Sequence, residues 1–412
     1  MIENLILGIS FFTLYISFVW ISFFYLDLMK KKEKTTDENY EYPSVEIVIP
    51  AYNEEKYIAR NIESLKDMDY PKDKLTIVVV DDGSSDRTSE IAGEYAEKFS
   101  NIKLIKKENG GKASALNSAL KISNSDLFAC VDADSYVEKT ALKRMVCHFQ
   151  EEGVGAVISA IKVHNPKNVF EYVQRIEYIM AALSRKIRAS INTLAMTPGV
   201  LSVYKTAIIQ KIGGFDEGNI TEDFEIALNL KKNGYNVRIE PESFTFTKVP
   251  SRIKELFRQR VRWYRGYLFN HYKYRDMFFN KKYGAFAFFQ LPLNIIYIPI
   301  MLLAIAIVTY GISINVIEFF SRTIMIKGYL LNFLEIPSIK EVVLSQNIKI
   351  LFPLFIGSLA GIYMFLVAHK MLKERIFYPA SIWVYFAAFP FLVSFYWITA
   401  ITQEILRFKR KW

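Results

Sequence analysis

Two long uncharged stretches set the limits on how this chain can fold. Residues 5–26 contain no charged side chain, and neither do residues 283–317. A helix of about 20 apolar residues crosses the hydrocarbon core of a bilayer, which is roughly 30 Å thick. Residues 29–282 instead mix charged and apolar side chains as a soluble domain does. The chain is therefore predicted to be a membrane protein with a large globular insert, and its 412 residues are too many for one compact core.

The charges around the first stretch predict its orientation. Glu3 precedes it, and Lys30, Lys31 and Lys32 follow it. A cleaved signal peptide carries its positive charge in front, and lysine-rich flanks stay on the cytoplasmic side. We therefore expect a transmembrane helix over residues 5–28 in the plasma membrane, with the N-terminus outside and the insert in the cytoplasm.

The C-terminal part is expected to contain about three spans. A straight helix over residues 283–317 would be roughly 50 Å long, more than one bilayer core. Pro292 and Pro299 are expected to break it into an interfacial or re-entrant lead-in and a span. The expected spans cover residues 293–313, 350–368 and 377–402, with a mixed-charge segment, 318–349, outside.

This arrangement leaves a conflict at the C-terminus. The loop before the last span carries Lys370, Lys373 and Arg375 and would be cytoplasmic, as basic loops usually are. The last span then places outside a second basic group, which consists of Arg407, Lys409, Arg410 and Lys411. One more or one fewer crossing would move the C-terminus inside.

Charge and cysteine usage exclude two classes of protein. The net charge of +10 comes without zinc-finger spacing or a recognition-helix signature, so a nucleic-acid partner is not expected. Basic residues beside membrane spans account for the charge better. Cys130 and Cys147 lack metal-site spacing and do not suggest a disulfide framework. The scattered histidines argue against a zinc site.

Strands and helices alternate through the first half of the insert. Short apolar runs predict strands, and apolar residues at helical spacing predict helices. The expected strands cover residues 45–50, 75–80, 102–105 and 127–131, and the expected helices cover 54–68, a stretch that Asp86 caps and that ends at about residue 98, and 112–122. Such alternation is typical of a parallel, Rossmann-like α/β sheet.

Pairs of carboxylates follow two of these strands. Asp132 and Asp134 come directly after residues 127–131, and Asp81 and Asp82 come after residues 75–80. Chemistry in such sheets gathers at the carboxyl ends of the strands, so both pairs would face one crevice. Neighbouring carboxylates repel each other unless a cation lies between them, and Mg²⁺ and Mn²⁺ prefer oxygen ligands. The pattern indicates a nucleotide and metal site, with turn-forming aspartates as the alternative.

Three later segments could serve the same crevice. Residues 110–112, Gly-Gly-Lys, open a helix and suit a diphosphate, although a flexible turn is an equal alternative. Residues 221–223, Thr-Glu-Asp, fit either a capped helix start or a general base in a cleft. Residues 253–268 form a basic amphipathic pattern, which fits the cytoplasmic membrane surface and would also attract an anionic ligand.

Six short segments occur in a distinctive order. They are residues 49–54 (IPAYNE), 81–84 (DDGS), 110–113 (GGKA), 132–134 (DAD), 221–223 (TED) and 259–263 (QRVRW). Together they resemble the motifs of membrane-embedded family 2 glycosyltransferases, which include cellulose, chitin, hyaluronan and poly-N-acetylglucosamine synthases. The likeness covers residues 43–265. It implies a cytoplasmic GT-A domain over residues 43–250, amphipathic interface helices over 251–282 and a C-terminal transmembrane region over 283–412.

The resemblance implies a role for each residue that matches a family motif. Donor binding falls to Ala51, Tyr52, Glu54, Asp81, Asp82, Lys112 and Asp132. Within this set, Asp81 and Asp82 would contact the uracil and ribose, Lys112 the phosphates and Asp132 the donor sugar. Asp134 would hold Mg²⁺ or Mn²⁺ on the diphosphate, and Asp223 would be the catalytic base. The acceptor or the diphosphate would contact Thr221, Glu222, Gln259, Arg262 and Trp263.

The resemblance also implies a reaction. We expect an inverting, metal-dependent, processive β-glycosyltransferase that extends and exports a polysaccharide from a UDP-sugar, with UDP-N-acetylglucosamine as the favoured donor. The motif at residues 259–263 accompanies processive synthases, and a flat indole can hold a sugar face. The short chain favours hyaluronan-like or poly-N-acetylglucosamine-like synthases.

Two alternatives stay open on the sequence. One is a single transfer to a polyprenyl phosphate or another membrane lipid. The other is a scaffold that has lost turnover, which the full set of acidic motif residues weakens. About four spans are narrow for a polymer channel, which leaves room for a homo-oligomer or an accessory membrane subunit.

Overall fold

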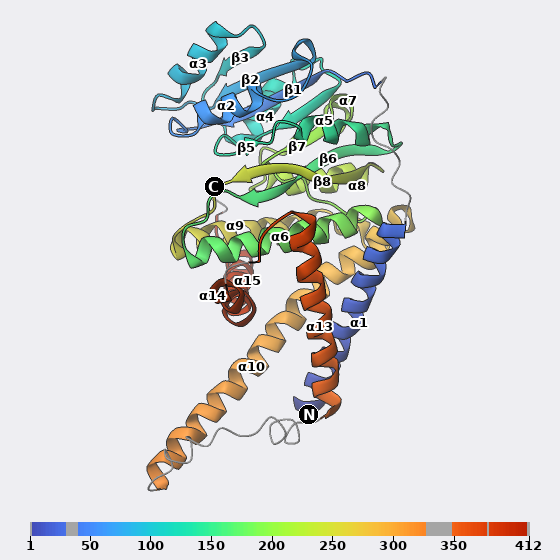
Figure 1. Cartoon of the computed structure of the whole chain (residues 1–412), viewed down its shortest axis with the longest axis vertical. Helices are drawn as coiled ribbons and strands as arrows, with labels where there is room; N and C mark the ends of the chain where they lie inside the picture. The colour runs from blue at the N-terminus through green and yellow to red at the C-terminus, as the bar shows by residue number, and fades with distance from the viewer. Residues whose placement is uncertain (1, 30–39, 327–347, 377–378, 410–412) are drawn as a thin grey trace.

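One eight-stranded sheet forms the centre of the globular part, and long apolar helices extend from one side of this part (Figure 1). The computed structural model describes residues 2–29, 40–326, 348–376 and 379–409. The sheet order is β3-β2-β1-β4-β7-β6-β8-β5. The strands are β1 (Val45–Ala51), β2 (Leu75–Asp81), β3 (Ile102–Lys106), β4 (Leu127–Cys130), β5 (Tyr136–Val137), β6 (Val154–Val163), β7 (Ser202–Lys205) and β8 (Asn236–Thr247).

The first four strands form the parallel half that the sequence predicts. β1 pairs with β2 and with β4, and β2 pairs with β3, all in parallel. β1, β2 and β4 are mostly apolar and buried, as strands covered by helices on both faces are, whereas β3 at the edge of the sheet is partly exposed. Ile47 shares a buried cluster with α2 (Ile58–Lys66), and Val48 shares another with α4 (Lys112–Leu120).

The other half of the sheet is mixed, which the alternation of strands and helices did not predict. β7 runs antiparallel to β4 and to β6, and β5 runs antiparallel to β8. The connection from β6 to β7, which contains α6 (Val169–Ser190), therefore begins and ends at the same end of the sheet. The sequence prediction concerned the first four strands, and the strands after them add the antiparallel pairs.

Polar side chains hold the turns before two helices, of which α2 begins later than predicted and α3 (Thr88–Lys98) follows Asp86, the cap that the sequence predicts. α2 begins at Ile58, after a turn in which the Glu54 amide donates to Thr88 Oγ1 at 2.7 Å. α3 begins two residues after Asp86, whose carboxylate accepts a hydrogen bond from the Thr88 amide at 3.0 Å.

A layer of helices separates the sheet from the apolar helices. It contains α6 and α9 (Ile253–Lys273), which both lie below the sheet (Figure 1). α9 is the basic amphipathic helix expected from the sequence. The remaining helices of the globular part are α5 (Ala141–Val146), α7 (Thr206–Lys211) and α8 (Glu222–Lys232).

Four helical stretches are long and apolar enough to cross a membrane, judged by length and composition. They are Glu3–Met29, Phe286–Met325, Ile348–Met371 and Pro379–Ile405. α1 (Ile2–Met29) packs along α13 (Ile348–Met371), where Tyr25 and Tyr363 share a hydrogen bond of 2.8 Å. α10 (Leu291–Met325) diverges from both (Figure 1).

The expected break at the prolines does not occur. A π-helical turn, Phe286–Gln290, continues directly into α10. Pro292 lies in the first turn, where a missing N–H does no harm, and Pro299 lies inside the continuous helix. The helix also extends beyond the predicted end, to Met325. The rest of the mixed-charge segment, and the lysines that follow α1, lie outside the described residues.

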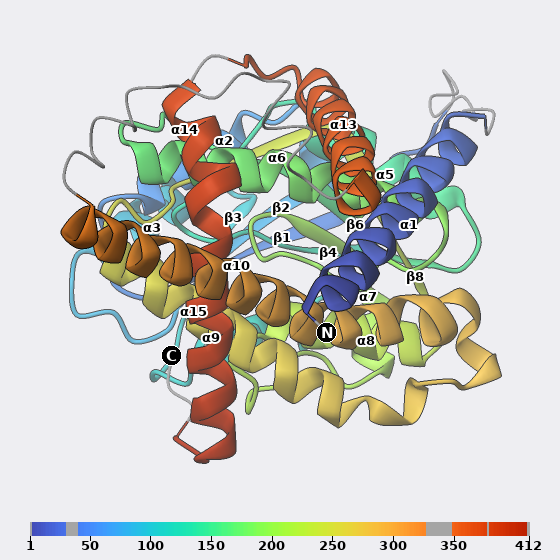
Figure 2. The ribbon, with the colours of Figure 1, turned by 90° about the horizontal axis from the view of Figure 1, so that it is seen from below.

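The last apolar helix takes a different direction from α1 and α13. α14 (Pro379–Trp383) and α15 (Phe389–Ile405) follow each other below α6 and α9, and α15 is seen end-on in Figure 1 and side-on in Figure 2. Trp397 stacks on Tyr264 of α9, with ring centroids 4.2 Å apart. Arg265 of α9 pairs with Glu404 at 2.7 Å and donates to the Phe408 carbonyl at 2.6 Å. The chain after α15 therefore lies against the globular part.

Candidate active site

The aspartates at the carboxyl ends of β2 and β4 lie at the same end of the parallel strands. β1 lies between β2 and β4, and Ala51 at its end is in register with Asp81. The Asp82 amide donates to the Ala51 carbonyl at 2.9 Å. Asp132 and Asp134 follow β4 on the other side of β1. The structure thus places both carboxylate pairs on the same side of the sheet, as the sequence predicts.

Three carboxyl groups crowd the end of β4 and the loop after β1. Burial, together with the Asp132 carboxylate, raises the pKa of Asp134 to about 6. Burial and the charges of Asp134 and Asp132 raise the pKa of Glu54 to about 7. Within the described residues, no three His, Cys, Asp or Glu side chains form a metal site by themselves. The crowded oxygens suit a hard cation that takes other ligands from a bound molecule or water.

Lys112, the first residue of α4, joins two of the predicted site segments. Its ammonium lies 2.5 Å from Asp132 Oδ1 and 3.2 Å from Glu222 Oε1. Burial works against the charge, but Asp132 and Glu222 hold the pKa of Lys112 well above its ordinary value. Burial also raises the pKa of Glu222, although Lys112 opposes this shift. The lysine therefore acts in this structure as a bridge between carboxylates, and contact with phosphates stays a prediction.

Gly199 makes this bridge possible, and no sequence pattern had singled it out. Its carbonyl accepts from the Asp132 amide at 2.9 Å. A Cβ at this position would lie 2.3 Å from Lys112 Nζ and 2.8 Å from Asp132 Oδ1. In the sequence, Pro198-Gly199 looks like any surface turn.

Asp82 organises the glycine turn before α4. Its Oδ1 accepts from Lys107 Nζ at 2.6 Å and from the Gly110 amide at 3.0 Å, and its Oδ2 accepts from the Gly111 amide at 2.7 Å. Gly111 has a left-handed φ of +86°, which favours glycine. Lys107 is a further site residue that the motifs had not indicated. Tyr52, just after β1, is exposed.

Asp223 is the second residue of α8 and is half-buried. Its Oδ1 accepts from the Phe224 amide at 2.8 Å, and its carbonyl accepts from Thr197 Oγ1 at 2.6 Å. In the part of the chain that the structure describes, no lysine or arginine forms an ion pair with its carboxylate. The group is thus positioned by backbone contacts and is available to accept a proton.

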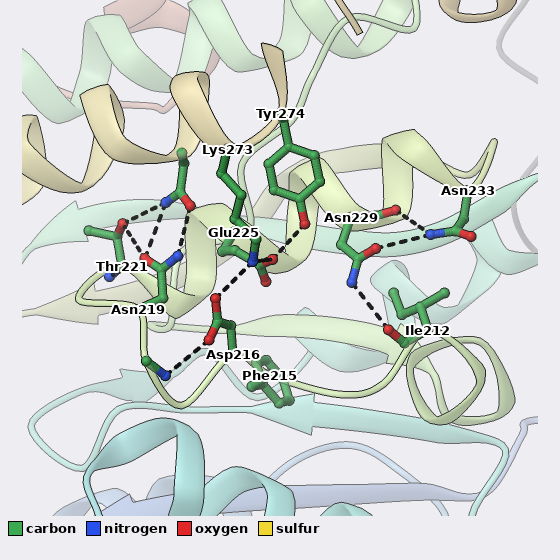
Figure 3. A network of polar contacts seen from close by, with 12 residues as sticks. Ile212, Phe215, Asp216, Asn219, Thr221, Glu225, Asn229, Asn233, Lys273 and Tyr274 are labelled. Carbon is green, nitrogen blue, oxygen red and sulfur yellow. Dashed lines mark hydrogen bonds and ion pairs between the residues drawn. The ribbon is translucent and has the colours of Figure 1, made fainter. Parts of the chain in front are cut away.

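Polar contacts lock α9 to the loop before α8 (Figure 3). Asn270 donates to Thr221 Oγ1 at 3.0 Å. Lys273 pairs with Asp216 at 2.8 Å and with Glu225 at 2.5 Å. Gly266 of α9 approaches so closely that a Cβ would lie 2.2 Å from Thr221 Oγ1. The helix with the 259–263 motif therefore fixes the position of the Thr-Glu-Asp segment.

The 259–263 motif has a buried cation at its centre. Arg260 is fully buried, pairs with Glu177 of α6 at 2.7 Å and lies 4.1 Å from the centre of the Trp263 ring. Arg262 donates to the Ile220 carbonyl at 3.1 Å, beside the Thr-Glu-Asp segment. Trp263 and Gln259 are half-buried. The Arg260–Glu177 pair, which the motif does not reveal, covers one face of Trp263.

The sheet and its acidic edge are those of a GT-A glycosyltransferase. The family described as "Glycosyl transferase family 2" matches residues 46–213. The probable glycosyltransferase YdaM of Bacillus subtilis (strain 168) is 32% identical over 295 residues, which cover 67% of this chain and 70% of the relative. The chain belongs to glycosyltransferase family 2.

Two further proteins are similar to this chain. The poly-beta-1,6-N-acetyl-D-glucosamine synthase of Staphylococcus aureus (strain COL) is 29% identical over 270 residues, which cover 62% of this chain and 64% of the relative, less than two thirds. The mannosyltransferase PcManGT of Pyrobaculum calidifontis, solved with GDP-Man and Mn²⁺, superposes with a TM-score of 0.62 at 19% identity over 98% of this chain and 100% of its own. This likeness extends the shared fold to the apolar helices.

Proposed function

We propose that the chain transfers a sugar from a UDP-sugar, with UDP-N-acetylglucosamine as the favoured donor, to the end of a growing polysaccharide. The observation that carries this proposal is the half-buried Asp223 carboxylate, which has no cationic partner in the described residues and follows the Lys112-bound Glu222. The similarity to a poly-beta-1,6-N-acetyl-D-glucosamine synthase supports the donor and the polymer product.

The proposed reaction is inverting. The acceptor hydroxyl attacks C1 of the donor sugar from the face opposite UDP, the bond from C1 to the diphosphate oxygen breaks, and Asp223 takes the hydroxyl proton. Lys112 keeps Asp132 fixed beside the donor sugar. Ala51, Tyr52, Asp81 and Asp82 would line the uridine. The segments with Thr221, Glu222, Gln259, Arg262 and Trp263 would hold the acceptor and the diphosphate, and the exposed part of the Trp263 ring would keep a polymer end in register.

The carboxyl groups at the end of β4 fit a divalent cation. Asp134 would hold Mg²⁺ or Mn²⁺, with Glu54 and Asp132 beside it. The raised pKa values of Asp134 and Glu54, which come first from burial and then from the neighbouring carboxylates, support this assignment, because a cation would relieve the repulsion between the carboxylates. When bound, the metal would neutralise charge on the departing diphosphate.

We infer a membrane arrangement that removes the conflict at the C-terminus. α1, α10 and α13 cross the membrane, whereas α14 and α15 lie along its cytoplasmic surface under α6 and α9. The N-terminus is then outside, and the 43–250 domain, the 251–282 helices and the C-terminus are cytoplasmic. Arg407 and Lys409 fall on the side that the positive-inside tendency requires. The contacts of Arg265 with Glu404 and Phe408 support this arrangement.

Product size tests the proposed reaction. Purified full-length protein would be incubated with labelled UDP-sugars and Mn²⁺, and UDP release would identify the donor. Asp223→Asn should abolish transfer and leave UDP binding nearly intact, because the carboxylate acts on the acceptor. Full transfer by this variant would refute Asp223 as the base, and a single lipid-linked monosaccharide as the product would refute polymerisation.

A second candidate function is a single transfer to a lipid phosphate. It is favoured by a cavity on the membrane side of Asp223, which two arginines of α6 line. The same product analysis separates this function from polymer synthesis.

A further inference from the structure

A cavity of about 200 Å³ lies below the candidate active site. α6 contributes Arg185 and Arg188 to its wall, and α8 contributes Phe224, the neighbour of Asp223. Gln290 and Asn294, at the start of the apolar helix α10, complete the wall on the membrane side. The cavity therefore connects the region of the proposed base with the level at which α10 leaves the globular part.

The two arginines of this cavity are not neutralised by the protein. Within the described residues, neither forms an ion pair. The side-chain hydrogen bond of Arg185 is a long one to Met196 Sδ, 3.6 Å. The buried Nε of Arg188 has no hydrogen-bond partner, and its guanidinium lies 5.6 Å from the ring of Trp20 in α1. Burial lowers the pKa of Arg185 to about 10 and also lowers the pKa of Arg188.

Two neighbouring cations of this layer are paired, in contrast to these two arginines. Lys186, between the two arginines in sequence, pairs with Asp27 of α1 at 3.2 Å. Arg260 of α9 pairs with Glu177. Asp223 and Glu177 act on Arg185 through space without contacting it. A fold that leaves two half-buried guanidiniums unpaired would be stabilised by an anion that binds between them.

The other residues that line the cavity do not neutralise the positive charge of the two arginines. Thr193, Ser184, Gln290 and Asn294 are neutral polar groups. Burial lowers the pKa of His271, which accompanies Tyr267 behind the wall, to about 4, so its ring is neutral. The site is thus cationic and apolar toward Phe224 and Tyr267, while Thr193, Gln290 and Asn294 hydrogen-bond to one another.

We propose that this cavity binds the phosphate group of an acceptor that is linked to a membrane lipid. Guanidinium groups bind phosphate through paired, charge-assisted hydrogen bonds. The position beside α1 and α10 fits a lipid chain, and the position beside Phe224 brings the group carried by the phosphate toward Asp223. The link to an acceptor rests on the proposed function, whereas binding of the phosphate does not.

Lipid binding by the full-length protein tests the proposal. The probes are a polyprenyl phosphate, the same polyprenol without phosphate, and inorganic phosphate, added to the protein in detergent. Arg185→Gln and Arg188→Gln are each expected to weaken binding of the polyprenyl phosphate by about 10- to 100-fold, the usual effect of losing hydrogen bonds between charged groups. Lys186→Gln is the matched control, since it removes a cation from the same helix and is expected to leave binding nearly unchanged.

Three outcomes would overturn the proposal. They are equal binding of polyprenol and polyprenyl phosphate, equal losses in the Lys186→Gln and arginine variants, and competition by inorganic phosphate at the same concentration as the lipid. Thermal unfolding checks that the variants fold. Because glutamine removes an unpaired, half-buried charge, the ligand-free arginine variants should unfold at the wild-type temperature or above it. A protein that binds the phosphorylated lipid but releases no UDP would refute the proposed function and leave this inference standing.

Discussion

Gly199→Ala should disable the site although it changes no motif residue. The new Cβ would lie 2.3 Å from Lys112 Nζ and 2.8 Å from Asp132 Oδ1, far closer than atoms pack. Gly199 has no left-handed φ, so the backbone accepts alanine, and the contact alone causes the effect. Lys112 ends in a flexible chain and can move, but only by leaving the carboxylates of Asp132 and Glu222.

The size of the effect follows from that displacement. Removing one partner of a buried ion pair costs about 3–5 kcal/mol, and over-packing that neighbours can relieve costs about 1–3 kcal/mol. Lys112 stays in the protein, so we expect the free energy of unfolding to fall by about 2 kcal/mol. Displacing a positioned group by about 1 Å is enough to slow a reaction about 100-fold, and we expect a loss of this order in UDP release.

The assay compares UDP release and Tm for Gly199→Ala and Gly93→Ala. At Gly93, in α3, a Cβ would meet Leu104 at 3.8 Å, an ordinary contact, and alanine favours a helix by about 1 kcal/mol. This control should keep its activity. On a Lys112→Met background, Gly199→Ala should cost less than in the wild type, because the nearest atom that it strikes is gone and only the contact with Asp132 remains. Normal UDP release and normal Tm in Gly199→Ala would refute the reasoning.

Three further predictions concern the metal, the α9 contact and the C-terminus. Because their pKa values are raised, Asp134 and Glu54 stabilise the folded protein while they are protonated, and this stabilisation is lost as the pH rises through about 6 and about 7. Mn²⁺ should therefore raise Tm more at about pH 8 than at about pH 5. Asp134→Asn should remove most of that difference. Gly266→Ala should lower Tm and slow UDP release, because its Cβ would strike Thr221 at 2.2 Å; a normal Tm would contradict the close approach. Leu406→Cys should react with a membrane-impermeant maleimide only after cell lysis. Leu406 is exposed and the native cysteines are buried, so the label reports on position 406. Labelling in intact cells would place the C-terminus outside.

The strand ends could be predicted from the sequence, because buried parallel strands are uninterrupted apolar runs and their acidic ends follow directly. Gly199 and the Arg260–Glu177 pair could not, since their roles arise from contacts between segments far apart in the chain. The sequence of α6 does contain a pattern typical of a helix, namely the apolar residues Val173, Ile176, Leu183 and Ile187 at helical spacing, and the structure buries all four.

Hydropathy predicted where the apolar helices are and not where they point. Pro379–Ile405 is long and apolar enough for a span, although its mean hydropathy of 1.7 is below the 2.0 to 2.4 of the other three stretches. Its position is set instead by aromatic and charged groups, such as Trp397 on Tyr264 and Glu404 on Arg265, that match α9. A hydropathy average contains no information about such pairing, which is why the C-terminal conflict could be recognised in the sequence but not removed there.

One of the proposed spans diverges from the other two, and this limits how a polymer product could cross the membrane. In the most apolar windows of α1, α10 and α13, only 6%, 11% and 11% of the residues are buried within the chain, and α10 diverges from the other two (Figure 1). The described spans of one chain therefore do not enclose a passage, whereas transfer to a lipid acceptor requires none. If the product is a polysaccharide that crosses the membrane, we expect the exporting unit to contain a second copy or another membrane subunit. Reconstitution at one chain per vesicle tests this expectation, because export of polymer by single chains would contradict it.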